Sequence, residues 1–295
     1  MGNDVDQERD AALTMRDRPS SGRPSLVDIL SDIGPRTAGS PQARRASRRI
    51  ADAMAALGME VEFQEFEFLG YEPGEPSLTV GGERWTAAPC LYARAAEVEG
   101  TLRALGRFTD VAAEVPVFAI VDGDTEVGRL YAAPFDAGAV PLGNVLGPTM
   151  AGVSAIVSSA DGRRLAALEG AEVALTTRGR LVEGARDRNV LGYLPGQKDE
   201  WVVVSSHFDS VWRGPGVLDN ATGVEGMVRV IERLPAERRS RGVIACAFAA
   251  EEIGLLGSRY FAADANLSGR ISSIVGAVNL DAIAHGEHFE VSVAP

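Results

Sequence analysis

The pattern of apolar and polar residues near the start of the chain predicts two amphipathic helices followed by a strand. Apolar residues recur at helical spacing over Leu26–Ile33, after Ser25 as a suitable N-cap and before a helix-breaking Gly-Pro pair. A second helical pattern covers residues 40–58, with Ser-Pro at its start and Gly at its end. Residues 59–68 then alternate as a strand does, with a change of phase that indicates a β-bulge.

Beyond residue 70 the pattern changes to short apolar pieces separated by Gly, Pro and Asp. The segment 70–186 is therefore predicted to be a separate, mainly β insertion, with a turn and helix end at 147–152. The insertion contains no His and no cluster of catalytic residue types, so we favour a lid or packing module over the alternative of an independent ligand site. Its predicted strands are Ser77–Val80, Val117–Val121, Val153–Ser158 and Val173–Thr177.

From residue 187 onward the pattern is an apolar strand, a loop and a helix, repeated. Uniformly apolar strands that alternate with helices are typical of a mostly parallel sheet covered by helices on both faces. The pattern over residues 187–295 therefore predicts a three-layer α/β fold. The predicted strands are Trp201–Val204, Val243–Ala250 and Ile274–Leu280, and the predicted helices are Thr222–Leu234, which opens with a Thr222/Glu225 capping box, and Leu255–Ala263.

These patterns give a domain organisation. Residues 1–22 are polar and charged and lack the apolar core of a signal peptide, so we expect a disordered N-terminal lead. Residues 23–69 and 187–295 form the α/β domain, and the insertion separates its two pieces. No apolar stretch reaches the roughly 18 residues that a membrane helix requires. We therefore expect a cytoplasmic protein.

Composition narrows the set of partners. A hydrophobic content of 45% is enough for a sizeable core, and the formal net charge is -12. This charge argues against nucleic acid and against anionic membranes, because both would repel most of the surface. The two cysteines, Cys90 and Cys246, imply no disulfide framework, and Cys246 lies in an apolar strand where a buried thiol is expected.

The candidate chemistry lies where the predicted strands end. In a parallel sheet the carboxyl ends of the strands meet at one edge, which is where sites form. Imidazole and carboxylate side chains are the ligands of metal ions that activate water, provided that one carboxylate stays free to move the proton. The pattern therefore predicts a two-metal hydrolase site from four stretches: His207-Phe208-Asp209, Gly216-Val217-Leu218-Asp219-Asn220, Glu251-Glu252 and Asn279-Leu280-Asp281.

The residue types and their order indicate separate roles. Asp209, two residues after His207, is placed to accept the other imidazole N–H and orient the ring. Asp219 lies on a Gly-rich turn before a helix, where it could bridge two ions, although a helix cap is the alternative. Adjacent residues at a strand end point in different directions, so we assign Glu251 as the general base and Glu252 as a ligand. Two cations about 3.5–4 Å apart would activate a shared water.

Together these segments resemble the dizinc aminopeptidases. That family includes the bacterial leucyl aminopeptidases, aminopeptidase Y, and the relatives glutamate carboxypeptidase and transferrin receptor. The resemblance covers the N-terminal helices and all of 187–295, and its most specific part is the string Glu251-Glu252-Ile253-Gly254-Leu255-Leu256-Gly257-Ser258. The insertion resembles the protease-associated domain found at the same place in many members.

The resemblance implies a ligand set that agrees with the roles above. His207 and Asp281 would hold one zinc ion, Asp219 would bridge, Glu252 would hold the other ion, and Glu251 would be the base. Zinc is chosen by resemblance, since mixed His and carboxylate ligation also suits manganese or cobalt.

One family ligand is not matched. The second zinc of the family also takes a His from a loop well after the Asn-x-Asp strand. Here His285 and His288 follow Asp281 too early for that position, and we expect them in an ordinary loop and in a final strand over His288–Val293. We therefore expect the chain to be the front portion of a longer protein.

The predicted function is that of a metal-dependent exopeptidase, an aminopeptidase that removes N-terminal residues from peptides. Two alternatives stay open. One is an amidohydrolase or carboxypeptidase that acts on another small amide, because metal ligands do not read the far side of a substrate. The other is a catalytically silent binding protein of the same fold, which the transferrin receptor relatives exemplify. The Glu251-Glu252 pair argues against a silent protein, whereas the unmatched His argues for one.

Overall fold

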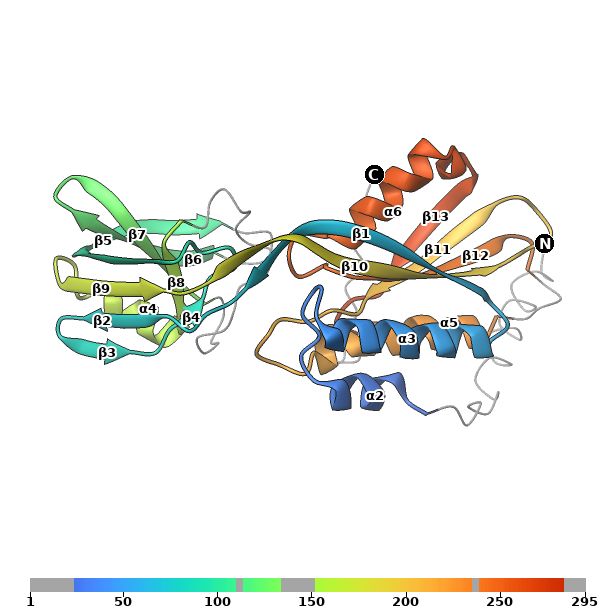
Figure 1. Ribbon diagram of the computed structural model, residues 1–295, viewed down its shortest axis with the longest axis horizontal. Helices are drawn as coiled ribbons and strands as arrows, with labels where there is room; N and C mark the ends of the chain where they lie inside the picture. The colour runs from blue at the N-terminus through green and yellow to red at the C-terminus, as the bar shows by residue number, and fades with distance from the viewer. Residues whose placement is uncertain (1–23, 110–113, 134–151, 235–238, 284–295) are drawn as a thin grey trace, which may run out of the picture.

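The computed structural model of the chain describes residues 24–109, 114–133, 152–234 and 239–283. Two β-sheets lie side by side along the long axis of the molecule, and two long strands run from one toward the other (Figure 1). These strands are β1 (Glu60–Glu72) and β10 (Arg180–Leu194), which pair antiparallel. The chain thus leaves the first sheet along β1 and returns along β10. The register shifts between Phe68 and Gly70, whereas residues 60–68 pair without a shift, so the bulge expected within 59–68 is not found there.

The first sheet carries the candidate site. Its strands in spatial order are β1, β10, β12 (Gly242–Phe248), β11 (Trp201–His207) and β13 (Ile274–Asn279). Strands β12, β11 and β13 are parallel, whereas β10 pairs antiparallel with both β1 and β12. The sheet is therefore mixed, because the two arms that carry the insertion run in opposite directions along one edge.

Helices cover both faces of this sheet. Figure 1 shows α2 (Leu26–Ile33), α3 (Pro41–Ala56) and α5 (Thr222–Glu232) on one face and α6 (Leu256–Leu267) on the other. Two short helical turns, η1 (Val217–Ala221) and η3 (Arg270–Ser273), precede α5 and β13. The predicted three-layer α/β architecture is confirmed. The core between the sheet and helices α2, α3 and α5 includes Leu30, Ile50, Met54, Val224 and Met227.

The predicted N-caps of α2 and α3, Ser25 and Ser40, are present. The prediction of a capping box at the start of α5 is wrong. Thr222 donates its hydroxyl to the Leu218 carbonyl at 2.7 Å and does not accept from the helix. Glu225 accepts instead from the Leu26 amide at 2.7 Å and from the Arg229 side chain at 2.6 Å. The reason is that η1 already forms a helical turn. The amides of Ala221 and Thr222 donate to the carbonyl groups of Gly216 and Val217, and the Gly223 amide donates to the Asn220 side chain.

The second sheet has the order β3-β2-β9-β5-β6-β7-β8-β4 and an apolar core that includes Leu78, Leu102, Ile120 and Leu130. All four predicted strands of the insertion are found. Residues 147–151 of the expected turn lie outside the described residues, and the boundaries 70–186 stay a prediction. The elements are β2 (Ser77–Val80), β3 (Glu83–Trp85), β4 (Ala88–Pro89), β5 (Ala96–Thr109), β6 (Glu114–Asp122), β7 (Thr125–Ala132), β8 (Ser154–Val157), α4 (Ser159–Leu165) and β9 (Glu172–Thr177).

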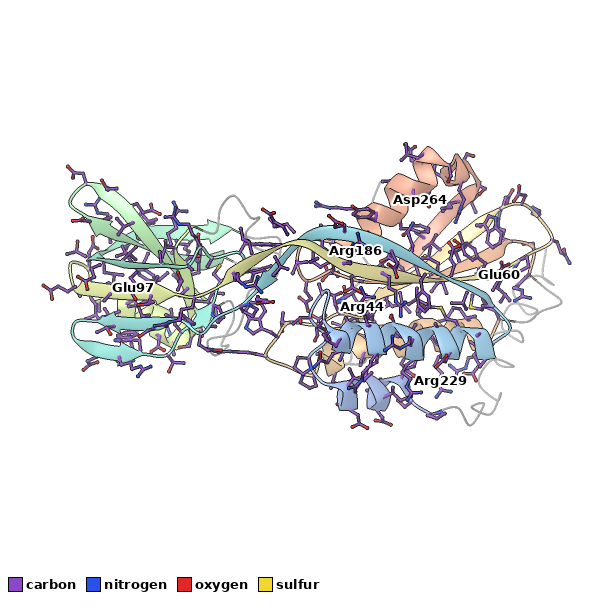
Figure 2. The ribbon with its side chains drawn as sticks, viewed as in Figure 1. Arg44, Glu60, Glu97, Arg186, Arg229 and Asp264 are labelled. Carbon is purple, nitrogen blue, oxygen red and sulfur yellow. The ribbon has the colours of Figure 1, made fainter. Side chains whose placement is uncertain are left out.

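Charged side chains lie on the outside of both parts. Figure 2 labels Glu97 on the second sheet, Arg186 on β10 and Asp264 on α6, and all three are exposed. Both cysteines are buried free thiols. Within the described part of the chain, each helix is too short or too polar to cross a membrane. The cytoplasmic location stays a prediction.

Candidate metal centre

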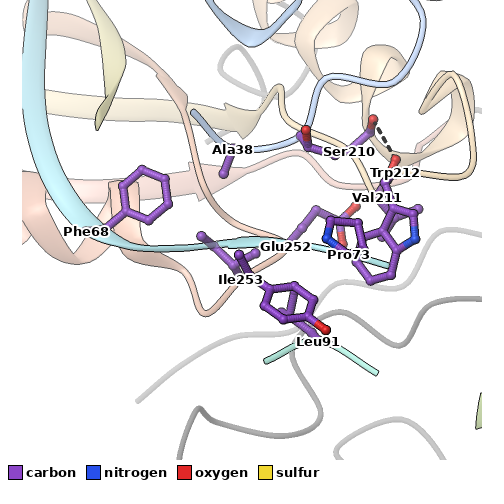
Figure 3. A pocket seen from close by; sticks show the side chains of 11 residues that line it. Ala38, Phe68, Pro73, Leu91, Ser210, Val211, Trp212, Glu252 and Ile253 are labelled. Atoms are coloured by element: carbon purple, nitrogen blue, oxygen red, sulfur yellow. Dashed lines mark hydrogen bonds between the residues drawn. The ribbon is translucent and has the colours of Figure 1, made fainter. Parts of the chain in front are cut away.

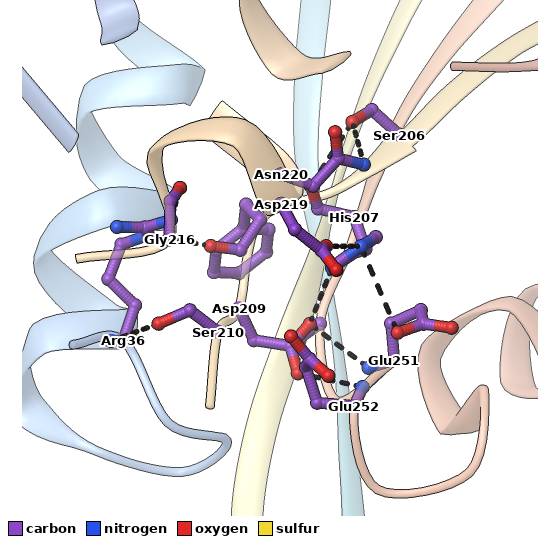
Figure 4. Close-up of polar contacts among 12 residues, drawn as sticks. Arg36, Ser206, His207, Asp209, Ser210, Gly216, Asp219, Asn220, Glu251 and Glu252 are labelled. Atoms are coloured by element: carbon purple, nitrogen blue, oxygen red, sulfur yellow. Dashed lines mark hydrogen bonds and ion pairs between the residues drawn. The ribbon is translucent and has the colours of Figure 1, made fainter. Parts of the chain in front are cut away.

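The candidate site lies at the edge of the first sheet where β12, β11 and β13 end. His207 is the last residue of β11, Glu251 and Glu252 follow β12, and Asp281 follows β13. Because these strands are parallel and adjacent, their carboxyl ends bring the side chains together (Figure 4). Asp219 reaches the same place from η1.

One nitrogen atom is the centre of this group. His207 is 2% exposed. Its Nε2 lies 3.0 Å from Oδ1 of Asp219, 3.4 Å from Oδ1 of Asp281 and 3.8 Å from Oε2 of Glu251. Ligand atoms of His207, Asp219 and Asp281 all lie within 4.8 Å of one another. Atoms that each sit about 2 Å from one zinc ion have separations of this size.

Asp209 lies on the Nδ1 side of the His207 imidazole. Its side chain is fully buried, and its Oδ1 lies 3.6 Å from Nδ1 of His207, which is longer than a normal hydrogen bond. The same carboxylate accepts from the backbone amides of Glu251 at 3.0 Å and Glu252 at 3.2 Å. Asp209 therefore ties the end of β11 to the pair of glutamates. The sequence interpretation missed this second contact because it joins positions more than 40 residues apart in the chain.

The loop that carries the glutamates is tightly folded. Its backbone closes through hydrogen bonds from the Leu256 amide to Ala250 and from the Gly257 amide to Ala249. A Cβ atom at Gly257 would lie 2.3 Å from the Ala249 carbonyl oxygen, so the close approach requires glycine. Leu255 has a φ of 59°, in the left-handed region. These constraints give a physical reason for the Glu-Glu-x-Gly-x-x-Gly spacing.

Asn220 joins the turn of Asp219 to the turn of Asp281. It is fully buried, and its amide donates to Ser206 Oγ at 3.1 Å and to the Leu280 carbonyl at 3.0 Å. Its side-chain oxygen accepts from the amides of Gly223 and Ala282. One side chain thus holds both carboxylate-bearing segments, a role that sequence interpretation did not assign. The Asp-Asn pair before a helix was the available signal.

The electrostatics of the site fit a cation. Burial raises the pKa of Glu251 to about 7, and burial together with Asp209 and Asp219 raises that of Glu252 to about 9. Burial lowers the pKa of His207, but contacts with Asp209, Asp219 and Asp281 outweigh this and raise it well above its ordinary value. The surroundings of Glu251 and Glu252 thus disfavour the ionised form of both carboxyl groups. A divalent ion would supply the missing positive charge.

An apolar pocket adjoins the carboxylates (Figure 3). The side chain of Glu252 lies in its wall beside Ile253. Leu91, which follows β4 of the second sheet, also lines the pocket, so residues from both parts of the molecule enclose it. The remaining lining residues are Thr37, Ala38, Phe68, Tyr71, Pro73, Ser210, Val211 and Trp212.

The structure thus brings the predicted site residues to one edge of the first sheet: His207, Asp209, Asp219, Glu251, Glu252 and Asp281. Asp219 is not a helix cap, because its carboxylate faces His207. His285 and His288 lie outside the described residues, as does the expected strand that starts at His288. The role of each residue stays a prediction at this point.

Sequence comparison connects the site to known peptidases. Residues 189–292 match Peptidase family M28. Aminopeptidase YwaD of Bacillus subtilis is 26% identical over 264 residues, which cover 80% of this chain and 56% of that protein. Leucine aminopeptidase 2 of Arthroderma otae is 32% identical over 108 residues, which cover 36% of this chain and 22% of the relative. The chain therefore spans little more than half the length of the longer-matching relative.

Comparison with solved structures gives the same fold. The aminopeptidase from Aneurinibacillus sp. strain AM-1 superposes with a TM-score of 0.65 at 23% identity, covering 87% of this chain and 68% of that one. A zinc aminopeptidase from Bacillus subtilis superposes with a TM-score of 0.62 at 21% identity, covering 88% and 68%. Residues 189–292 thus match Peptidase family M28, and the chain has the fold of these two solved aminopeptidases.

Proposed function

We propose that this protein is a zinc-dependent aminopeptidase, which hydrolyses the peptide bond after a free N-terminal residue. The observation that carries the proposal is the arrangement around His207 Nε2, with Asp219 and Asp281 at 3.0 and 3.4 Å and Glu251 at 3.8 Å. The match of residues 189–292 to Peptidase family M28 and the names of the relatives, which are aminopeptidases, add support. Because the chain covers 56% of aminopeptidase YwaD, its own activity is part of the proposal.

The chain's residues divide into two ligand sets. His207, Asp219 and Asp281 would hold one zinc ion, and Asp219 and Glu252 would hold a second. Zinc, when bound, polarises the scissile carbonyl and lowers the pKa of water so that it attacks near neutral pH. Asp209 would keep the His207 ring oriented through its contact with Nδ1.

Glu251 would move the proton. Its carboxylate lies on the same side of His207 as Asp219 and Asp281 but is held on a separate loop, so it can face the attacking water without being a ligand. It would accept a proton from that water and donate it to the leaving amine. The backbone amide of Glu251 is fixed by Asp209 at 3.0 Å, which limits the movement of the base.

The apolar pocket beside Glu252 supports a substrate with an apolar group next to the scissile bond. Its lining is mainly aromatic and aliphatic, with the carboxylate of Glu252 on one wall. A pocket of this composition binds an apolar group by desolvation while a few polar atoms orient it. We therefore use a leucine substrate for the test.

The experiment compares leucine p-nitroanilide with its N-acetylated equivalent, with and without a chelator. The proposal predicts release from the free amine alone, loss of release with the chelator and recovery with added zinc. Equal release from both substrates would indicate an amidohydrolase that does not require a free amine. Release from neither, in a sample shown to be folded by circular dichroism, would contradict the proposed activity.

A further inference from the structure

Arg36 is a buried cation that no sequence motif pointed to. Its side chain is 0% exposed, and it makes no ion pair with a carboxylate within the part of the chain that the structure describes. Its guanidinium donates to backbone carbonyls instead: to Phe208 at 2.8 Å, Leu30 at 3.0 Å, Gly34 at 3.2 Å, Gly216 at 2.8 Å and Pro215. Burying a charged group without an ion pair is unfavourable, so a buried guanidinium that binds carbonyl groups points to a specific structural role.

The carbonyl groups belong to three separate segments. Leu30 and Gly34 mark the end of α2. Phe208 follows the predicted ligand His207, and Gly216 begins the turn that carries Asp219. Arg36 thus connects α2 to both loops that supply ligands from β11 and η1 (Figure 4).

The backbone of Arg36 adds to the same connection. Its amide donates to Ser210 Oγ at 3.0 Å, and the Ser210 amide donates to the Arg36 carbonyl at 3.3 Å. Gly216, with a φ of 55°, has no room for a side chain: a Cβ atom there would lie 2.6 Å from Nη2 of Arg36. The guanidinium and the Gly216 turn therefore fit closely against each other.

The position of Asp219 depends on this turn. The Asp219 side chain is 58% exposed, and its described contact is with His207 itself. Val217 and Leu218, which lead to it, are also exposed, at 37% and 38%. With little packing around the side chain, the backbone must set where the carboxylate lies. Arg36 and Asn220 hold that backbone from its two sides.

The charge of Arg36 acts on the same group of residues. Burial lowers the pKa of Arg36 to about 10, against the opposing effect of Asp209, Glu252 and Asp219. The guanidinium therefore stays charged at neutral pH. It offsets part of the repulsion among the buried carboxylates before a metal ion enters.

We propose that Arg36 is a positioning residue of the metal centre, which locks the loops at 208–210 and 215–216 to α2 and so pre-organises Asp219 opposite His207. This inference rests on the proposed metal centre. Arginine suits the role because its planar guanidinium directs five N–H groups outward in fixed directions, whereas lysine has one ammonium on a flexible stem. The geometry and the charge are therefore separable by substitution.

The test is the zinc affinity of Arg36→Lys, measured by competition with a chromogenic chelator. Lysine keeps the positive charge but lacks the planar set of N–H donors. We therefore expect zinc to bind at least about tenfold more weakly, in line with the effect of residues that support metal ligands. Arg188→Lys is the matched control, since Arg188 is a partly buried arginine that donates to Ser47 and lies over Phe63. The control is expected to bind zinc as the wild type does.

Zinc affinity of Arg36→Lys within twofold of the wild type would overturn the proposal, and so would an equal loss in Arg188→Lys. Hydrogen exchange of the zinc-free wild type gives a second test that needs no variant. The amides of Phe208, Ser210 and Ala221 donate to the carbonyl groups of Phe248, Arg36 and Gly216. They are expected to be protected as strongly as those of α2, and exchange about 100-fold faster than in α2 would overturn the proposal. A wild type that binds no zinc would contradict the proposed function, and hydrogen exchange would still decide the effect of Arg36 on the loops.

Discussion

The two sheets of the molecule bury different kinds of side chain. Within the described residues, the second sheet from β2 to β9 buries Ser154 and Thr177 as its polar residues, against an otherwise apolar core. The first sheet and its loops bury many more, several of them charged: Arg36, Ser47, Asp187, Asn189, Ser205, Ser206, His207, Asp209, Ser210 and Asn220. The buried polar residues therefore gather in the part of the molecule that contains the candidate metal centre.

The difference teaches how the site is held. Burying a polar group is unfavourable unless the group is paired, and the first sheet pairs its polar groups across segments that are distant in sequence. Asn220 joins two carboxylate-bearing turns, and Asp209 joins β11 to Glu251 and Glu252. Within the described residues, the second sheet is held mainly by apolar packing, with few buried polar groups such as Thr177. Substitutions in the first sheet should therefore alter chemistry or pairing, whereas those in the second should alter stability alone.

The largest effect is expected from Glu251→Gln. Glutamine cannot take a proton from the attacking water, so turnover of leucine p-nitroanilide should fall by about a thousandfold, within the range for loss of a general base. The zinc content should stay that of the wild type, because Glu251 is not a proposed ligand. Unchanged turnover would remove Glu251 from the role of base. Asp264→Asn, on the exposed surface of α6, is the control.

Leu130→Ala tests the second sheet. Leu130 is fully buried in its apolar core, so the cavity should lower the free energy of unfolding by about 3 kcal/mol. We expect no change in zinc affinity. Urea unfolding measures the first quantity and chelator competition the second. A zinc affinity that falls with stability would show that the two sheets are coupled more strongly than their buried groups indicate.

Asn189→Ala tests pairing in the first sheet. Asn189 is fully buried on β10; its amide donates to Gln64 and to the Gly257 carbonyl, both at 2.8 Å, and its oxygen accepts from the Ala249 amide at 3.1 Å. Alanine leaves buried backbone groups unpaired, which should lower the free energy of unfolding by about 2 kcal/mol.

Thr177→Ala is the counterpart of Asn189→Ala in the second sheet. Its hydroxyl donates to the Arg94 carbonyl at 2.6 Å, and its loss should lower the free energy of unfolding by about 1 kcal/mol. Urea unfolding of the two variants under the same conditions makes the comparison. An effect of Thr177→Ala that equals or exceeds that of Asn189→Ala would contradict the contrast between the two sheets.

Asp187→Asn should give the smallest effect, seen as a change in pH dependence. Burial raises the pKa of Asp187 to about 6, although the amides of Gly39 and Arg188 donate to it. A carboxyl whose folded pKa is raised adds stability at low pH, and this stability is lost as the pH rises through about 6. Between pH 5 and 7 the zinc-free wild type should therefore lose about 1 kcal/mol more stability than Asp187→Asn. Parallel pH profiles of the two proteins would contradict the assignment.

Local patterns predicted the elements well, because they depend on neighbouring residues. The helix over Leu26–Ile33 and the strand that ends at His207 follow from periodicity and length. The placement of candidate ligands followed from one rule, that parallel strands end at a common edge. Confirmation of that edge required the pairing of β11 with its neighbours.

The parts that could not be predicted depend on contacts between distant segments. The antiparallel pairing of β1 with β10 joins residues on either side of the whole insertion, and no local pattern records it. The capping box failed because η1 extends the helix backward and frees Glu225 to bind the Leu26 amide. Arg36 escaped notice because its partners are carbonyl groups, which every residue has.

The most direct test of the central claim is the zinc content of the folded chain after dialysis against trace zinc, compared with that of Asp219→Asn and Asp264→Asn. The account predicts that the wild type and Asp264→Asn retain zinc, and that Asp219→Asn loses it because the proposed bridging ligand is gone. Absence of zinc from the wild type, or equal zinc in Asp219→Asn, would contradict a metal centre built on His207, Asp219 and Asp281.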